Sequence, residues 1–168
     1  VASERLDEMS DPELSIDRAL KQYLQLGYSE SWINQRLKSI EIRKELTDEW
    51  QRVGVKEGQE FAILTDIITK TWADKTTKEY KILKGLKKEN LRDNMTNTEL
   101  ILNMLAEAST KDISEAVNPK NLQESKKVAS QGGNVAKVAR AELEAKTGKK
   151  VVTNQNAKNL LDNQIKEK

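Results

Sequence analysis

The 168-residue chain contains no cysteine and no histidine. Their absence excludes disulfides, zinc sites built from Cys and His, a thiol nucleophile and the commonest general base. Catalysis would have to use carboxylates, serine or lysine, and no grouping of these predicts a nucleophile, a base and an oxyanion site together. We therefore expect a protein that is not an enzyme, with no catalytic residue, no metal site and no cofactor.

Large apolar residues are also scarce. Hydrophobic residues make up 36% of the chain and aromatic residues 4%, whereas 33% are charged, compared with about 25% charged residues in ordinary globular domains. A composition of this kind predicts helices that each keep much of their surface in water. We expect an all-α fold, an extended domain of about six helices, in which Trp32, Trp50 and Trp72 belong to the core.

Long hydrophobic runs are missing as well. No apolar stretch approaches the ~20 residues of a membrane span, and the first residues lack the basic start and apolar core of a secretion signal. The sequence thus predicts no membrane association and a cytoplasmic location. The chain starts at Val1 instead of methionine, as a fragment or a processed product would.

Glycine and proline occur at few positions, and those positions divide the chain into helices. Pro12 follows Asp11 and precedes a helical pattern that ends at Gly27. Ser29 predicts the start of a long second helix over residues 30–53, which could brace shorter helices or pair with a second copy. Further patterns predict helices over residues 61–72 and 77–83. Thr96 and Glu99 have the spacing of a capping box, so another helix should begin near Asn97.

That last helix should break or bend near Ser109 and Thr110 and end before Pro119. We accordingly divide the chain into a helical body (1–118), a helical segment rich in small residues (119–148) and a polar tail (149–168). Val151 and Val152 allow a short strand in the tail, and an amphipathic turn follows them.

The small-residue segment contains two adjacent glycines, Gly132 and Gly133, inside a helical pattern. Each costs roughly 1 kcal/mol relative to alanine, so either the helix breaks there or the close approach of another backbone compensates. One interpretation is a weakly packed peripheral helix. The other is a docking surface for a partner or a second subunit, formed by Gly132, Gly133, Ala136 and Ala139. Together with the long second helix, this surface predicts a homo-oligomer.

The strongest charge feature lies just before the predicted capping box. Residues 75–92 contain seven basic and two acidic residues, a net charge of +5, whereas residues 1–17 have a net charge of −5. Lysines spaced three apart form a broad band on a helix and suit a phosphate backbone. The candidate nucleic-acid-binding residues are Lys78, Lys81, Lys84, Lys87, Lys88 and Arg92. A solvated helix face and a site for an acidic protein are the alternatives.

Several short runs are similar to those of a known family. They are Arg43-Lys44-Glu45-Leu46, Gly54 through Glu60 followed by Phe61-Ala62-Ile63-Leu64, Lys84-Gly85-Leu86-Lys87-Lys88, Met95 and Thr98-Glu99-Leu100. With them, residues 42–143 resemble the C-terminal region of bacterial and phage-related proteins that carry a BRO-type N-terminal domain, including the DNA-damage-inducible protein D family. The segment from Asp11 to Ser29 resembles the linker before that region.

The resemblance implies a role in the bacterial DNA-damage (SOS) response or in prophage control. The partner would be the RecA recombinase filament, with single-stranded DNA, or a phage repressor. The BRO-type domain would precede Val1, so DNA binding cannot be inherited from it. We expect a regulatory domain that modulates RecA-coated DNA, or alternatively an antirepressor module that binds protein and has no affinity for DNA. The basic residues named above come from the charge pattern, not from the resemblance.

Overall fold

The computed structural model describes residues 12–167, with side chains described for residues 16–162. Over this range the fold is all-α, as the sequence predicts. Seven α-helices and one short 3₁₀-helix are described, and the chain has no strand there. The elements are α2 (Pro12–Leu26), α3 (Glu30–Arg52), α4 (Gln59–Ala73), α5 (Thr77–Leu83), η1 (Arg92–Asn94), α6 (Asn97–Val117), α7 (Leu122–Thr147) and α8 (Ala157–Glu167).

Side-chain caps fix most helix starts where the sequence places them. Ser29 accepts a hydrogen bond from the backbone N of Trp32 at the start of α3. Thr96 and Glu99 form the predicted capping box at the start of α6, and Thr76 forms a second one with Glu79 at the start of α5. Each box satisfies two backbone N–H groups that a helix leaves unpaired. The proposed cap at Asp11 lies outside the described residues.

Helix α6 does not break at Ser109 and Thr110, so that prediction is wrong. The Thr110 hydroxyl donates to the carbonyl of Ala106 one turn earlier, which satisfies it inside the helix. The helix ends at Val117, and its cap residue Asn118 adopts a left-handed conformation (φ 51°) before Pro119. Residues 151 and 152 form a bend, so the short strand is also not present.

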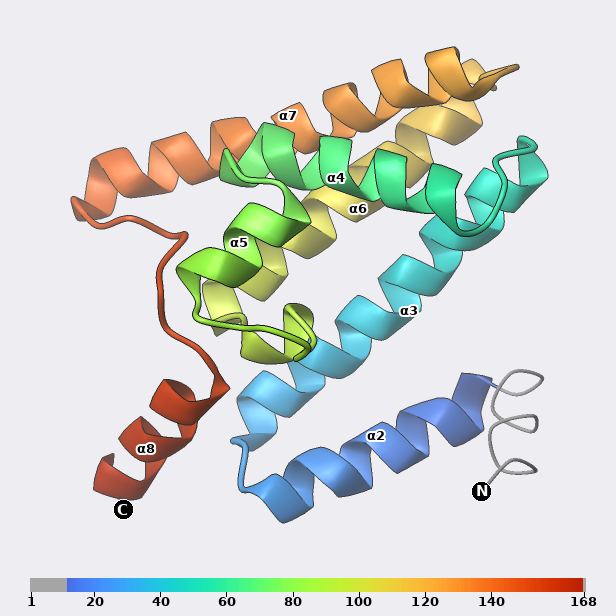
Figure 1. The fold of residues 1–168 in the computed structure, drawn as a ribbon. Helices are drawn as coiled ribbons and strands as arrows, with labels where there is room; N and C mark the ends of the chain where they lie inside the picture. The colour runs from blue at the N-terminus through green and yellow to red at the C-terminus, as the bar shows by residue number, and fades with distance from the viewer. Residues whose placement is uncertain (1–11, 168) are drawn as a thin grey trace.

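The core lies where α3, α4, α6 and α7 meet (Figure 1). Trp50, Trp72, Leu64 and Leu100 are completely or almost completely buried there, and Trp32 is also buried, as predicted for all three tryptophans. In Figure 1, α2 and α8 lie on the opposite side of the molecule from α7. The long α3 braces the shorter helices, because it packs along α6 and against α2.

Helix α7 belongs to the same core as the helical body. Its Ala129 and Ala136 have no exposed surface, so the boundary at residues 118 and 119 is a turn between two packed helices. The polar tail is also attached to the body. The Asn156 amide donates to the carbonyl of Lys84, and the backbone N of Ala157 donates to Asn94 Oδ1.

Candidate nucleic-acid interface

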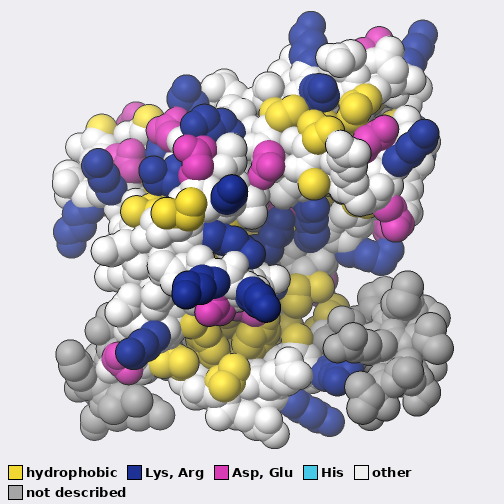
Figure 2. Space-filling view, viewed as in Figure 1, with side chains coloured by type: hydrophobic (Ala, Val, Ile, Leu, Met, Phe, Trp, Pro, Cys, Tyr) yellow, Lys and Arg dark blue, Asp and Glu magenta, His cyan; other side chains and the backbone are white. Residues whose placement is uncertain are grey.

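An open groove runs along the N-terminal half of α4, α5 and the loop that follows α5. Its volume is about 650 Å³, and it is lined on its cationic side by Arg43, Lys78, Lys81 and Lys87. Asp66 is the acidic residue in its lining, and the Asp66 carboxylate accepts a hydrogen bond from the backbone N of Thr77. Figure 2 shows lysine and arginine side chains gathered over this part of the molecule. We call this feature the basic groove.

Four of the six predicted nucleic-acid-binding residues lie at or beside the basic groove. Lys78 and Lys87 line it and are exposed, Lys81 lines it and is half-buried, and Lys88 is exposed next to Lys87. No ion pair joins these four lysines to a carboxylate among the described residues. Their charges are therefore available to an anion in solvent.

Lys84 does not belong to this surface, so its assignment as a nucleic-acid-binding residue is wrong. Its side chain is completely buried in an ion pair with Glu99, with Nζ 2.8 Å from Oε1. The same ammonium donates to the carbonyls of Thr153 (2.9 Å) and Gln155 (2.5 Å). Burial lowers the pKa of Lys84, although the Glu99 carboxylate opposes the effect. Lys84 thus joins α5, α6 and the tail.

The Glu99 carboxylate, which binds Lys84, also accepts a hydrogen bond from the Tyr80 hydroxyl. Burial and the nearby Glu99 charge raise the pKa of Tyr80, which stays a neutral donor. Because Glu99 also closes the capping box of α6, one side chain combines a local role that the sequence reveals with a long-range role that it does not.

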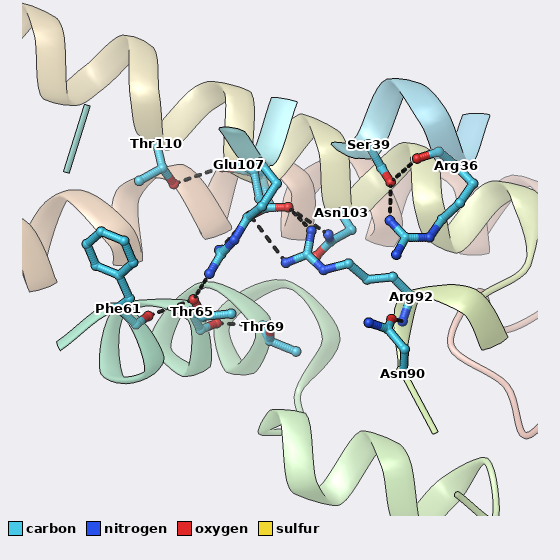
Figure 3. Close-up of polar contacts among 12 residues, drawn as sticks. Arg36, Ser39, Phe61, Thr65, Thr69, Asn90, Arg92, Asn103, Glu107 and Thr110 are labelled. Atoms are coloured by element: carbon cyan, nitrogen blue, oxygen red, sulfur yellow. Dashed lines mark hydrogen bonds and ion pairs between the residues drawn. The ribbon is translucent and has the colours of Figure 1, made fainter. Parts of the chain in front are cut away.

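Arg92 has a structural role that the sequence did not predict, because the two terminal nitrogens of its guanidinium are engaged inside the molecule. The Arg92 guanidinium binds the buried carboxylate of Glu107, with Nη1 2.6 Å from Oε1 (Figure 3). Arg43 from α3 binds the other oxygen at 2.8 Å, and the Asn103 amide donates to Glu107 as well. Burial would raise the pKa of Glu107, but the charges of Arg92 and Arg43 outweigh burial and hold that pKa below its ordinary value.

A smaller recess of about 200 Å³ adjoins the basic groove, because Thr65, Thr77 and Lys81 line both. The recess continues between α4 and the segment that carries η1. Its remaining lining residues are Thr69, Asn90, Leu91, Arg92, Met95 and Asn103. In Figure 3, Arg92 extends between α4 and α6, with Thr65 and Thr69 on one side and Asn90 near its base.

Sequence reasoning missed Glu107, Asn103 and Arg43. One signal was present, because Asn103, Glu107, Thr110 and Ser114 recur at spacings of three and four along α6, the same register as the buried Leu100. Polar residues at core positions of a helix indicate a buried hydrogen-bond network. The arginines that complete the network come from distant segments and leave no periodic signal.

The predicted small-residue docking surface is occupied by the chain's own helices. A Cβ atom at Gly132 would lie 2.7 Å from Thr110 Cα, and one at Gly133 would lie 2.9 Å from the Ile68 carbonyl oxygen. Ala136 is buried and Ala139 is packed against the core. The glycines permit α7 to approach α6 and α4 closely, so this face is not available to a partner, and the prediction of self-association loses that support.

Among residues 12–167 no helix is long and apolar enough to cross a membrane. The described side chains include no group of three or more carboxylates that could hold a metal ion. Comparison with known proteins adds no relative: no family model, no curated protein and no solved structure matches this chain.

Proposed function

We propose that this chain is a non-catalytic regulatory domain that binds the phosphate backbone of single-stranded DNA, bare or coated with the RecA recombinase, in the bacterial cytoplasm. One observation carries the proposal: Lys78, Lys81 and Lys87 line one open groove and are not paired with any described carboxylate. The resemblance to the BRO-type and DNA-damage-inducible protein D families supplies the choice of recombinase-coated DNA and of the DNA-damage response.

The groove suits a backbone more than a base sequence. Lysine ammonium groups are compact point charges on flexible stems and contact phosphate without reading base edges. Such binding releases condensed counterions, so it should weaken steeply with salt. For four lysine contacts on a single strand, the slope of log K against log salt concentration should be about −3.

The test is fluorescence anisotropy of labelled single- and double-stranded DNA at two salt concentrations, with and without RecA. The informative variant carries Lys78→Glu, Lys87→Glu and Lys88→Glu, three exposed positions at or beside the groove. A matched control carries Lys127→Glu, Lys149→Glu and Lys150→Glu, which are also exposed and change the net charge equally. Lys84 is left intact because its replacement would disturb the core.

Salt-sensitive binding that the groove variant loses and the control retains would support the proposal. An equal loss of DNA affinity in both variants would show that binding depends on net charge alone and not on the groove. Binding in no condition would refute a nucleic-acid role and would leave the alternative, a protein-binding antirepressor module that recognises a phage repressor without DNA affinity.

A further inference from the structure

The recess beside the basic groove presents hydrogen-bond donors with few competing acceptors. Lys81 Nζ, the Asn90 amide, Arg92 Nε and the Thr77 hydroxyl make no hydrogen bond to another described residue. Two other polar groups of the lining are already satisfied, because the Thr65 hydroxyl donates to the Phe61 carbonyl and the Asn103 carbonyl oxygen accepts from Trp72 Nε1. A ligand that fills this recess must therefore bring acceptor oxygens.

Charge favours the same kind of ligand. Two arginines, Arg43 and Arg92, share the single carboxylate of Glu107 behind the recess, which leaves one positive charge in excess. Lys81 adds a second, which the nearby Glu89 carboxylate offsets in part, and no carboxylate is among the described residues that line the recess. A phosphate monoester carries about −1.5 to −2 charges near neutrality and three acceptor oxygens, whereas an internal phosphodiester carries one negative charge.

We propose that this recess binds a phosphate monoester, the terminal phosphate of a nucleic-acid strand whose remaining phosphates lie on the lysines of the basic groove. This inference rests on the proposed function, because it places the end of the bound strand in a recess that adjoins the basic groove. The shape of the recess favours the terminal phosphate of a strand over a phosphate in its interior. The recess is smaller than the groove that it adjoins, about 200 Å³ against 650 Å³, and its walls include the buried Leu91, Met95 and Asn103.

The experiment compares one oligonucleotide with a 5′-phosphate, with a 3′-phosphate and with hydroxyl groups at both ends. A strand whose terminal phosphate enters the recess should bind about tenfold more tightly than the strand with hydroxyl groups at both ends, as expected for one additional charge-assisted contact. Lys81→Met should abolish this preference while preserving the length of the side chain. Thr77→Val, a variant of nearly equal shape, should reduce the preference with little risk to folding.

Lys78→Met is the matched control, because Lys78 lines the groove but not the recess. It should weaken all three oligonucleotides by a similar factor and leave their ratio unchanged. Equal binding of all three by the unmodified protein would overturn the recess assignment and leave the proposed DNA binding intact. A preference that Lys78→Met and Lys81→Met reduce equally would also overturn it.

A titration with inorganic phosphate, followed by the NMR chemical shifts of backbone amides, tests whether the recess binds phosphate independently of any nucleic-acid strand. Saturable shifts at Lys81 and Arg92 with no binding of any oligonucleotide would support a phosphate site and refute the proposed DNA-binding role, indicating a free phosphate or nucleotide as the source. Absence of shifts together with absence of an end preference would refute the phosphate site.

Discussion

Gly132→Ala tests how closely α7 approaches α6. In an isolated helix the substitution would stabilise by about 1 kcal/mol, because alanine has the higher helix propensity. In this structure the new Cβ would lie 2.7 Å from both the Cα and the backbone N of Thr110, and closer still to the Thr110 hydroxyl. A rotation of the threonine side chain relieves only the last contact. The two helices must separate to relieve the others.

Overpacking of this kind costs typically 1–3 kcal/mol, and contact with backbone atoms belongs at the upper end of that range. After subtraction of the propensity gain we expect a loss of about 2 kcal/mol in the free energy of unfolding. For a chain of this size the loss corresponds to a fall of about 4–8 °C in Tm. Urea denaturation followed by far-UV circular dichroism would measure the first quantity, and calorimetry the second.

Two further variants sharpen the test. Ser130→Ala, at an exposed position of the same helix, should change stability by less than about 0.5 kcal/mol and controls for propensity. Adding Thr110→Ala to Gly132→Ala should recover only part of the loss, because the Thr110 Cα and N remain in place. An unchanged or raised stability for Gly132→Ala, or complete recovery in the double variant, would refute the proposed close approach.

Two other predictions concern the buried ionic groups. Lys84→Met should destabilise the protein by about 3–5 kcal/mol, because it leaves the buried Glu99 carboxylate without its cation; urea denaturation measures this, and Lys84→Met with Glu99→Gln should lose less than the sum of the single variants. Stability should also fall in acid. Arg52 holds the pKa of Glu49 below 4.5, and Arg92 and Arg43 do the same for Glu107 despite its burial. The contribution of these two ionised carboxylates to folding stability is present above pH 4.5 and is lost as the pH falls through their lowered pKa values. Thermal melts from pH 7 to pH 2.5 that show no such decline would contradict these ion pairs, and Glu107→Gln should flatten the decline.

The sequence predicted the helices well because their ends depend on local chemistry. Ser29, Thr96 and Gly148 act within one turn of the helix that they cap or end, so their effect can be recognised without knowledge of the fold. The break expected at Ser109 and Thr110 failed for the opposite reason. Low helix propensity at those positions is overcome by tertiary packing, since Thr110 lies buried against Gly132.

The candidate site was predicted only in part. The charge run singled out Lys78, Lys81, Lys87 and Lys88, which the structure places at or beside one groove. It could not separate them from Lys84, which has the same spacing and is buried. The difference arises from Glu99, 15 residues away, and from the carbonyls of Thr153 and Gln155, about 70 residues away. Nothing in the spacing of lysines contains that information.

The sequence by itself determined the all-α class, most of the helix boundaries and the presence of a strongly basic segment, because each follows from the properties of neighbouring residues. The break expected in α6 and the turn expected where α8 forms an 11-residue helix are the exceptions. The tertiary structure alone decided which charges face water and which form the buried pairs, and whether the glycines of α7 contact a partner or the chain's own helices. Those outcomes depend on the free energy of burying charged and polar groups, which is favourable only when partners from distant segments meet in the folded chain.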